Sequence, residues 1–408
     1  MRRGGGREGI LAVVRPTREP VVTKIASSPS PAAVDYDVTL IFSVETSNKN
    51  WVLAAHVPGL GQVKAKQTIE PNVDALSKAI EGYRRRATAS GAAVERVIVV
   101  YEAGYGGFWL ARWLDAQGVE VHVVQPSSVP VERRKRRAKS DKIDADLLLR
   151  TLLAWLRGEP RVCSMVRVPD EADEDARRPT REREELVRER ISLTNRIGAT
   201  LATLGVDDYN PLRRDRRTKL ETLRTPLGKS LPEHARAKIL RILERLELIL
   251  GQIAAIERRR DAALEDEAPG REEGMIQRLA GLRGIGAQSA TVLVYEAFIR
   301  SFANGNALGS YAGLTGTPFN SGGSEREQGV SKSGNRRLRG AMGELAWLWL
   351  RYQPESALAK WFRERLAGAN GRMKKILLVA LARKLLIALW RYVTQGVVPE
   401  GAVFLPAS

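Results

Sequence analysis

Short apolar runs alternate with amphipathic stretches over the first third of the chain. Four runs of mainly apolar residues predict strands at 37–45, 51–57, 96–101 and 119–124. The spacing of apolar positions predicts helices at 73–89 and 108–117. The run at 51–57 follows a turn-like segment, so we expect it to form a hairpin with the first strand. Strands that alternate with helices predict an α/β domain with a largely parallel sheet.

Helical periodicity dominates the rest of the chain, beyond a charge-rich connector. Two long amphipathic helices are predicted at 181–204 and 234–263, with a Pro- and Arg-rich insertion at 206–232 between them. Such a pair is typical of a helical hairpin or coiled coil that serves dimerisation and spacing, and a bundle within one chain fits the pattern equally well. The C-terminal domain is predicted to be mainly α, with helices at 340–352, 356–366 and 372–394.

Shifts in composition divide the chain into five segments. The first is rich in Gly, Arg and Pro without periodicity, which predicts a flexible basic arm or an over-long start. An α/β domain, a linker with the helical hairpin, a C-terminal domain and a tail follow it. The predicted boundaries are 1–34, 35–158, 159–272, 273–396 and 397–408.

The charge balance indicates a nucleic-acid partner. The 408 residues include 66 Lys and Arg against 47 Asp and Glu, a net charge of +19. An excess of this size over a folded chain is typical of nucleic-acid binding, although a generally basic proteome has the same effect. The single Cys163 excludes a disulfide framework and fits a reducing cytoplasm. No apolar run approaches the roughly 20 residues that span a bilayer, so we expect a cytoplasmic protein without a membrane partner.

Four carboxylates are candidates for a metal site. Glu45 and Glu102 each follow a predicted strand, where parallel sheets bind ligands, and Asp141 and Asp144 lie three residues apart on a predicted helix. Carboxylate oxygens suit Mg²⁺ or Mn²⁺. A solvated, charged helix explains the two Asp residues alone. Together the four acids indicate an RNase H-like fold in which metal ions organise phosphoryl transfer.

Basic and glycine-rich segments supply candidate nucleic-acid contacts. The turn containing Gly284 and Gly286 has the helix-hairpin-helix pattern, which holds a phosphate through backbone N–H groups, and an ordinary tight turn fits it equally. The segment at 311–334 is predicted to be an open Gly- and Ser-rich loop. On chemistry alone, Ser321, Ser324, Ser331 and Ser333 are all candidate nucleophiles there. The other candidate contacts are Arg133, Arg134, Lys135, Arg136, Arg137, Lys139, Lys332, Asn335, Arg336 and Arg337.

Six motifs together resemble one family of insertion-sequence transposases. Members of that family have an N-terminal RuvC-like domain with four acids and a C-terminal domain that carries a serine, and they act as bridge-RNA-guided recombinases. The resemblance covers residues 38–395. It rests on VYEAG at 100–104, KSDKIDA at 139–145, GIG at 284–286, YAGLT at 311–315, NSG at 320–322 and VSKSGN at 330–335.

The resemblance implies a role for each candidate residue. It makes Ser321 the nucleophile and Glu102, Asp141 and Asp144 the second, third and fourth acids. The first acid is commonly Asp, and Glu45 stands at the matching position. The resemblance also implies Mg²⁺ as cofactor, donor and target DNA and a non-coding guide RNA as partners, and a homodimer that assembles into a tetramer.

Two other functions remain compatible with the sequence. One is a metal-dependent nuclease like the Holliday-junction resolvases, in which water replaces Ser321 as the nucleophile. The other is an inactive nucleic-acid-binding remnant, favoured if Glu45 cannot bind a metal.

Overall fold

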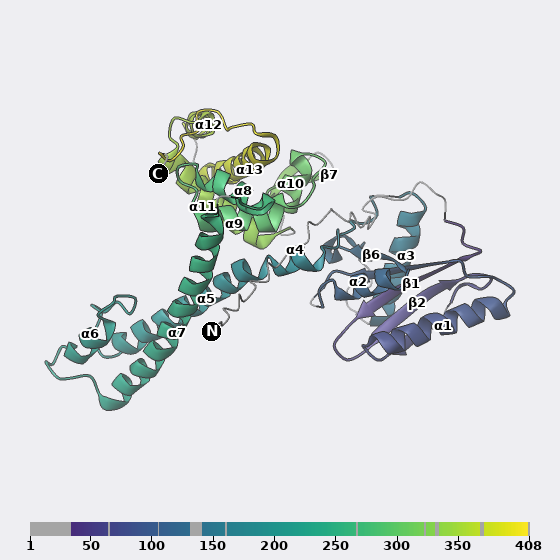
Figure 1. The fold of residues 1–408 in the computed structure, drawn as a ribbon, viewed down its shortest axis with the longest axis horizontal. Coiled ribbons are helices and arrows are strands. Elements are labelled where there is room, and N and C mark those ends of the chain that lie inside the picture. The colour runs from purple at the N-terminus through teal and green to yellow at the C-terminus, as the bar shows by residue number, and fades with distance from the viewer. Residues whose placement is uncertain are drawn as a thin grey trace, which may run out of the picture. The chain divides into compact units, whose positions relative to one another are not determined.

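A computed structural model describes most of the chain beyond residue 33. The described residues are 34–63, 66–104, 106–130, 141–159, 161–266, 268–321, 324–330, 334–367 and 371–406, with only the backbone described at 141, 317–321, 324–330 and 372. They form two compact units, Met1–Asp170 and Glu171–Ser408 (Figure 1). The predicted contacts Arg133 to Arg137, Lys139 and Lys332 lie outside the described residues.

A mixed six-stranded sheet forms the centre of the N-terminal unit. Its strands are β1 (Thr39–Thr46), β2 (Trp51–Val57), β3 (Gly61–Gln62), β4 (Gln67–Ile69), β5 (Arg96–Glu102) and β6 (Glu120–Val124). The order is β3-β2-β1-β5-β6, and β4 also pairs with β2. Among the predicted strands, β1, β5 and β6 run parallel and β2 forms the expected antiparallel hairpin with β1. The sheet as a whole is mixed rather than largely parallel, because the short strands β3 and β4, which were not predicted, also pair antiparallel with β2. The turn after β1 is too short for a crossover and forces β2 to run antiparallel.

Helices cover both faces of this sheet, because each central strand is apolar on both sides. Leu40, Phe42 and Val44 of β1 pack under α1 (Val73–Ala89) and α2 (Trp109–Ala116). The alternate residue Ile41 faces the opposite side, where α3 (Asp141–Leu156) packs (Figure 1). A 3₁₀ turn, η1 (Pro126–Ser128), follows β6. This α/β architecture is consistent with the predicted RNase H-like fold.

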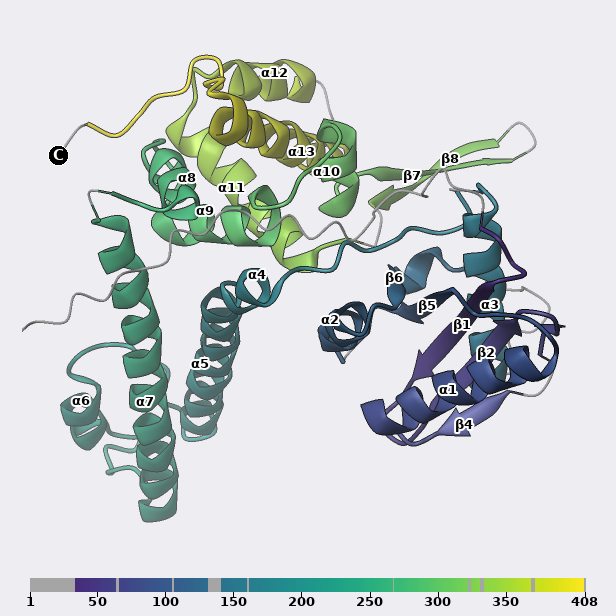
Figure 2. The same ribbon diagram turned by 45° about the vertical axis from the view of Figure 1, so that its right-hand side comes forward.

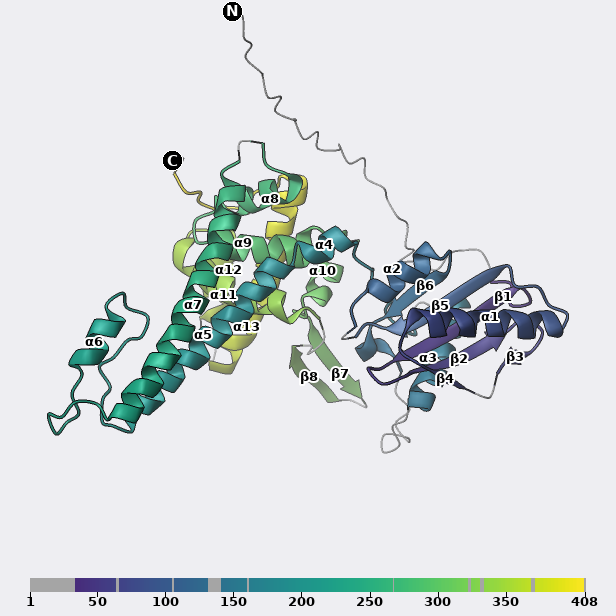
Figure 3. The ribbon, with the colours of Figure 1, turned by 60° about the horizontal axis from the view of Figure 1, so that its bottom comes forward.

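Two long helices form an arm of the C-terminal unit. After the short helix α4 (Glu171–Asp175), α5 (Arg178–Ala202) packs against α7 (Glu233–Leu264), with α6 (Arg216–Thr222) in the insertion between them (Figure 3). Their buried stripes include Ile197, Leu201, Ile239, Ile242, Leu243 and Leu246. The hairpin therefore closes its apolar stripe within one chain. The predicted coiled coil and its role in dimerisation stay predictions.

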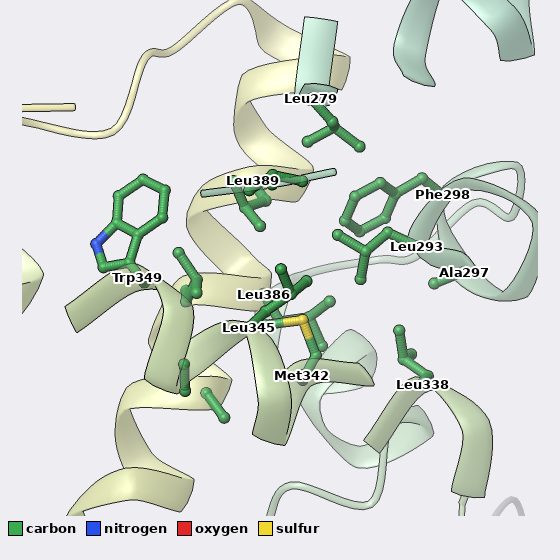
Figure 4. Close-up of a cluster of buried hydrophobic side chains, with 14 of the residues drawn as sticks. Leu279, Leu293, Ala297, Phe298, Leu338, Met342, Leu345, Trp349, Leu386 and Leu389 are labelled. Atoms are coloured by element: carbon green, nitrogen blue, oxygen red, sulfur yellow. The ribbon is translucent and has the colours of Figure 1, made fainter. Parts of the chain in front are cut away.

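The body of the C-terminal unit is helical, as predicted. Its helices are α8 (Arg271–Ala280), α9 (Ala287–Leu293), the π-helical turn η3 (Val294–Phe298), α10 (Gly305–Tyr311), α11 (Arg336–Tyr352), α12 (Ala357–Leu366) and α13 (Gly371–Gln395). They bury one large core, in which Phe298, Met342 and Trp349 converge with leucines from four helices (Figure 4). Burial of this apolar surface is the main stabilising contribution to the unit.

A β-hairpin replaces the open loop predicted at 311–334. Strands β7 (Gly316–Ser321) and β8 (Ser324–Val330) pair antiparallel and extend away from the helices of their unit (Figure 2). The prediction of an open backbone was therefore wrong. Two glycines between two short runs are a recognised sequence signal for a hairpin turn, and the interpretation of Gly322 and Gly323 as loop-forming residues missed it.

Candidate active site

Two of the predicted acids lie next to each other at one edge of the N-terminal sheet. The parallel strands β1 and β5 pair as far as Val44 and Tyr101, so Glu45 and Glu102 are the next residues in the same register. Both residues are half-buried, and both border one cavity of about 410 Å³ at the strand ends. Side chains alternate along a strand, which places both carboxylates on the face that carries Ser43 and α3.

The start of α3 is tied to the same strand. Ser43 is buried two residues before Glu45, and its Oγ donates to the backbone oxygen of Ala145 at 2.6 Å. Ala145 follows Asp144, and Asp141 is the first residue of α3, one turn earlier. This bond therefore fixes the first turns of α3 against β1.

The described residues place two of the four acids at one cavity and leave the other two untested. Asp144 is half-buried but is not among the residues that line the cavity of Glu45 and Glu102, and only the backbone of Asp141 is described. Among the residues whose side chains are described, no group of three or more Asp, Glu, His or Cys lies close enough to hold a metal. The four-acid site stays a prediction. Two of its four positions, Glu45 and Glu102, border the same cavity.

A fifth acid on α3 has a different environment. Asp146 accepts from Gln62 at 2.9 Å and forms ion pairs with Arg150 at 2.9 Å and Lys66 at 3.5 Å. Its negative charge is compensated by two cations of the protein. These contacts give Asp146 a structural role in holding α3 to the β3–β4 segment.

The backbone of Ser321 lies at the end of the β7–β8 hairpin. Ser321 is the last residue of β7 and pairs with Ser324, the first residue of β8. Its side chain is not among those described, so the structure leaves its role as nucleophile untested.

A buried carboxylate near the base of this hairpin was missed by the sequence interpretation. Glu296 lies in η3 and is 1% exposed. Arg181 of α5 donates to its two oxygens at 2.9 and 3.2 Å, and the side-chain amide of Asn335 donates to it at 2.8 Å. Tyr311 donates its hydroxyl to the backbone oxygen of Glu296 at 3.0 Å. One glutamate therefore connects α5, α10 and the start of α11.

The partners of Glu296 outweigh the effect of its burial. Burial raises the pKa of this carboxyl, but the hydrogen bonds from Arg181 and Asn335, together with the charge of Arg181, hold the pKa below its ordinary value. Burial lowers the pKa of the neighbouring Arg177, as does the positive charge of Arg300. Glu296 is thus the anion of a mainly cationic cluster.

The predicted nucleic-acid contacts of α11 have protein partners of their own. Asn335 caps α11, because its side-chain oxygen accepts from the backbone N–H groups of Arg337 and Leu338. Arg337 pairs with Glu184 of α5 at 2.6 Å, whereas Arg336 is exposed on the first turn. Binding of nucleic acid by these residues stays a prediction, and Asn335 would have to exchange existing bonds for it.

The turn with Gly284 and Gly286 joins α8 to α9, as its pattern predicts. Gly284 has φ +92°, and a Cβ there would lie 2.9 Å from Cβ of Tyr352. The C-terminal tail pairs with this turn, since the N–H of Arg283 donates to the oxygen of Val403 at 3.0 Å. Packing alone explains Gly284, so the phosphate-binding role of a helix-hairpin-helix stays a prediction.

Comparison with known proteins identifies the family. A family model described as "Transposase IS116/IS110/IS902 family" matches residues 276–360, and a transposase model for the DEDD domain of IS110 elements matches residues 54–205. A putative transposase, y4rJ, from Sinorhizobium fredii is 47% identical over 383 residues, which are 92% of this chain and 97% of the relative. The chain belongs to the IS116/IS110/IS902 family of transposases.

More distant relatives agree with this assignment. The transposase for insertion sequence element IS1328 from Yersinia enterocolitica is 27% identical over 74% of this chain and 85% of its own length. A probable family 20 transposase from Pseudomonas aeruginosa is 26% identical over 73% and 84%.

Membership of the IS110 family fixes the general activity. This transposase is an enzyme that recombines DNA, and the match to a DEDD domain indicates dependence on a divalent metal. The matched segments include Glu102, Asp141, Asp144 and Ser321, while Glu45 precedes them. Within the described part of this IS110-family chain, no helix is long and apolar enough to cross a membrane.

Proposed function

We propose that this transposase cuts and rejoins DNA through Ser321, assisted by Mg²⁺ or Mn²⁺ held by Glu45, Glu102, Asp141 and Asp144. The observation that carries the proposal is the shared cavity of Glu45 and Glu102 at the ends of two parallel strands. Ligands bind beyond the carboxyl ends of strands in such sheets.

The residues at this edge fit a hard cation. Carboxylate oxygens are the preferred protein ligands of Mg²⁺ and Mn²⁺, and the half-buried Glu45 and Glu102 supply two carboxylates at the same edge of the sheet. Two neighbouring carboxylates repel each other unless a cation or proton lies between them. When bound, the ion supplies positive charge that stabilises a phosphoryl transition state and promotes loss of a proton from a hydroxyl. The longer side chain of Glu45 replaces the Asp that is common at this position.

Ser321 provides the nucleophile in this proposal. Its oxygen forms a bond to the phosphorus of the scissile phosphodiester, the bond from phosphorus to one deoxyribose oxygen breaks, and that oxygen takes up a proton while the serine loses its own. The phosphoserine link conserves the phosphodiester bond energy, so reversal onto another strand end rejoins DNA. The end of a hairpin that extends from its unit suits a residue that must reach DNA (Figure 2).

A guide RNA and an oligomer complete the proposal. Pairing between a structured RNA and DNA would select the site, while the net charge of +19 holds the phosphate backbones. The resemblance to the family is the support for a homodimer that assembles into a tetramer.

A covalent-adduct experiment tests the role of Ser321. The protein is incubated with its element-flanking transcript, Mg²⁺ and paired donor and target DNA, and denaturing gels are searched for a protein–DNA adduct. We expect an adduct for the wild type and none for Ser321→Ala. Cleavage without an adduct that survives Ser321→Ala would establish the water-dependent nuclease instead, and binding without any cleavage would identify an inactive remnant.

A metal-binding experiment tests the acids independently of DNA. We expect Mn²⁺ to raise the melting temperature of the wild type, and Glu45→Gln or Glu102→Gln to remove most of this increase. Asp115→Asn is the matched control, because Asp115 is an exposed acid of the same unit. An equal response in Glu102→Gln and the control would contradict the proposed site.

A further inference from the structure

The cavity beside Glu45 and Glu102 has an aromatic wall. Trp51 and Trp109 both line it, with ring centroids 6.3 Å apart and an interplanar angle of 37°. Trp51 is only 5% exposed, whereas Trp109 is 45% exposed. One indole therefore supports the other, and the outer indole has a large accessible surface.

The packing of α2 does not account for the position of Trp109. Trp109 is the first residue of α2, and the helix packs on the sheet through Leu110, Ala111 and Leu114. A single exposed apolar residue on a convex surface is ordinary. Trp109 instead lies in the wall of a cavity that Glu45 and Glu102 also border, and an aromatic wall next to a few polar residues is typical of ligand pockets.

Two glycines of the same cavity differ in the space around them, as far as the described residues show. Gly104 and Gly106 follow Glu102 and line the cavity. Neither has a positive φ, and an added Cβ at Gly106 would meet no atom within 4 Å. Neither the backbone conformation nor packing against the described residues therefore requires glycine at 106, which lines the same cavity as Trp109.

We propose that Trp109 stacks on a nucleobase of the DNA strand whose phosphate is held at Glu45 and Glu102, an inference that rests on the proposed function. A volume of about 410 Å³ lies in the range that accommodates small ligands such as a nucleotide.

Stacking on Trp109 is independent of DNA sequence. Every base has a π-face, so a contact with the face of the Trp109 indole does not distinguish the four bases. This property suits an enzyme whose target choice is delegated to a guide. The base contact would fix the position of the neighbouring phosphate relative to the two acids.

The test compares two oligonucleotides that carry the same charge. Full-length protein is titrated, in Ca²⁺, with a thymidine oligomer and with a fully abasic oligomer, both of about ten nucleotides, a length within the usual range for single-strand sites. Backbone contacts are common to both oligomers. The ratio of the Kd for the abasic oligomer to the Kd for the thymidine oligomer therefore isolates base contacts. We expect Trp109→Ala to reduce this ratio by about five- to tenfold, as loss of one stacked base does. Trp109→Phe retains an aromatic face and should keep most of the ratio.

Two further variants separate stacking from folding. Trp347→Ala is the matched control, since Trp347 of α11 is 48% exposed but belongs to the other unit. It should leave the ratio unchanged. Gly106→Ala has room for its methyl group, so we expect an unchanged melting temperature and a reduced ratio. An unchanged ratio in Trp109→Ala, or an equal loss of affinity for both oligomers, would overturn the proposal.

The two experiments distinguish failure of the stacking proposal from failure of the proposed function. If Glu102→Gln abolishes metal-dependent DNA cleavage while Trp109→Ala keeps the ratio, the acid site stands and the base contact is rejected. If Trp109→Ala lowers the ratio while Glu102→Gln cleaves DNA normally, the cavity binds a base but is not the site of chemistry. That result rejects the acid site, and with it a base contact that positions a phosphate at these acids.

Discussion

The side-chain nitrogen of Asn335 donates to the carboxylate of Glu296 at 2.8 Å, while the oxygen of the same amide caps α11. The backbone N–H of Asn335 also donates to the backbone oxygen of Tyr311 at 2.7 Å. The β7–β8 hairpin lies between residues 311 and 335, so both of its ends are fixed at this point. A buried ion pair thus anchors the segment that carries Ser321.

Substitution of Asn335 should separate its two roles. Asn335→Ala removes the cap of α11, which costs about 1 kcal/mol, and one partner of Glu296. Asn335→Asp keeps a good capping group but places a second carboxylate against Glu296. We expect Asn335→Ala to increase hydrogen exchange at the first turn of α11. In Asn335→Asp the cap should persist and the melting temperature should fall at neutral pH. If both variants keep the hydrogen exchange and the melting temperature of the wild type, the amide of Asn335 contributes little to stability.

Glu296 should make the stability of the protein depend on pH on the acid side. Its pKa is lower in the folded protein than the ordinary 4.5, so its ion pair contributes stability fully above 4.5, and that contribution is lost as the pH falls through the folded pKa. Glu296→Gln cannot titrate. We expect the difference in melting temperature between wild type and Glu296→Gln to be largest at neutral pH and to narrow below 4.5. A difference that stays constant with pH would exclude this contribution.

Gly334 should tolerate no side chain. It has φ +99°, and a Cβ would lie 2.6 Å from the backbone nitrogen of Gly313. The left-handed conformation alone costs about 1–2 kcal/mol for another residue, and the contact is with backbone that cannot rotate away. Gly334→Ala should therefore lower the melting temperature by several degrees.

Gly340 provides the control for Gly334. It lies inside α11, and an added Cβ would meet nothing within 4 Å. Gly340→Ala should raise stability, because Ala is favoured over Gly in a helix by about 1 kcal/mol. Destabilisation of similar size in both variants would mean that the close approach of Gly334 and Gly313 is not the cause.

Ser43 should affect metal binding without contacting the metal. Ser43→Ala removes a buried hydrogen bond to Ala145, which costs about 1 kcal/mol, and releases the first turns of α3 from β1. We expect a lower melting temperature and a smaller stabilisation by Mn²⁺. Thr200→Ala is the control, since it removes an exposed bond to Arg196 on α5. If Ser43→Ala lowers the melting temperature but keeps the wild-type stabilisation by Mn²⁺, the position of α3 does not affect metal binding.

Local sequence patterns predicted most elements of the fold. The bounds of β2 and α1 agree with the predicted segments, because β2 is an uninterrupted apolar run and α1 has a clear helical periodicity. The antiparallel direction of β2 was predicted correctly from the short turn that precedes it. The strands β3 and β4 were missed, since two or three residues carry no periodicity.

The candidate site was only partly visible in the sequence. The pairing of Glu45 with Glu102 followed from two apolar strands that each end on an acid. Glu296 gave no such signal, because its partner Arg181 lies 115 residues away and no local motif joins them. An isolated acid within the apolar stretch 292–299 was the one available hint. Charges that pair over long sequence separations become evident only when the helices are placed in three dimensions.

The hydrogen bond between Tyr311 and Asn335 has a consequence for the evolution of these enzymes. The hairpin leaves the helical core after the buried Leu314, and the chain is joined to the core again at Asn335. The bond between the backbones of Tyr311 and Asn335 does not depend on the hairpin's own side chains. Closing a loop whose ends already meet depends only weakly on its length. Insertions, deletions and substitutions between β7 and β8 therefore have little effect on the stability of the helical core. Related transposases can differ in this hairpin while the helices of the core remain the same.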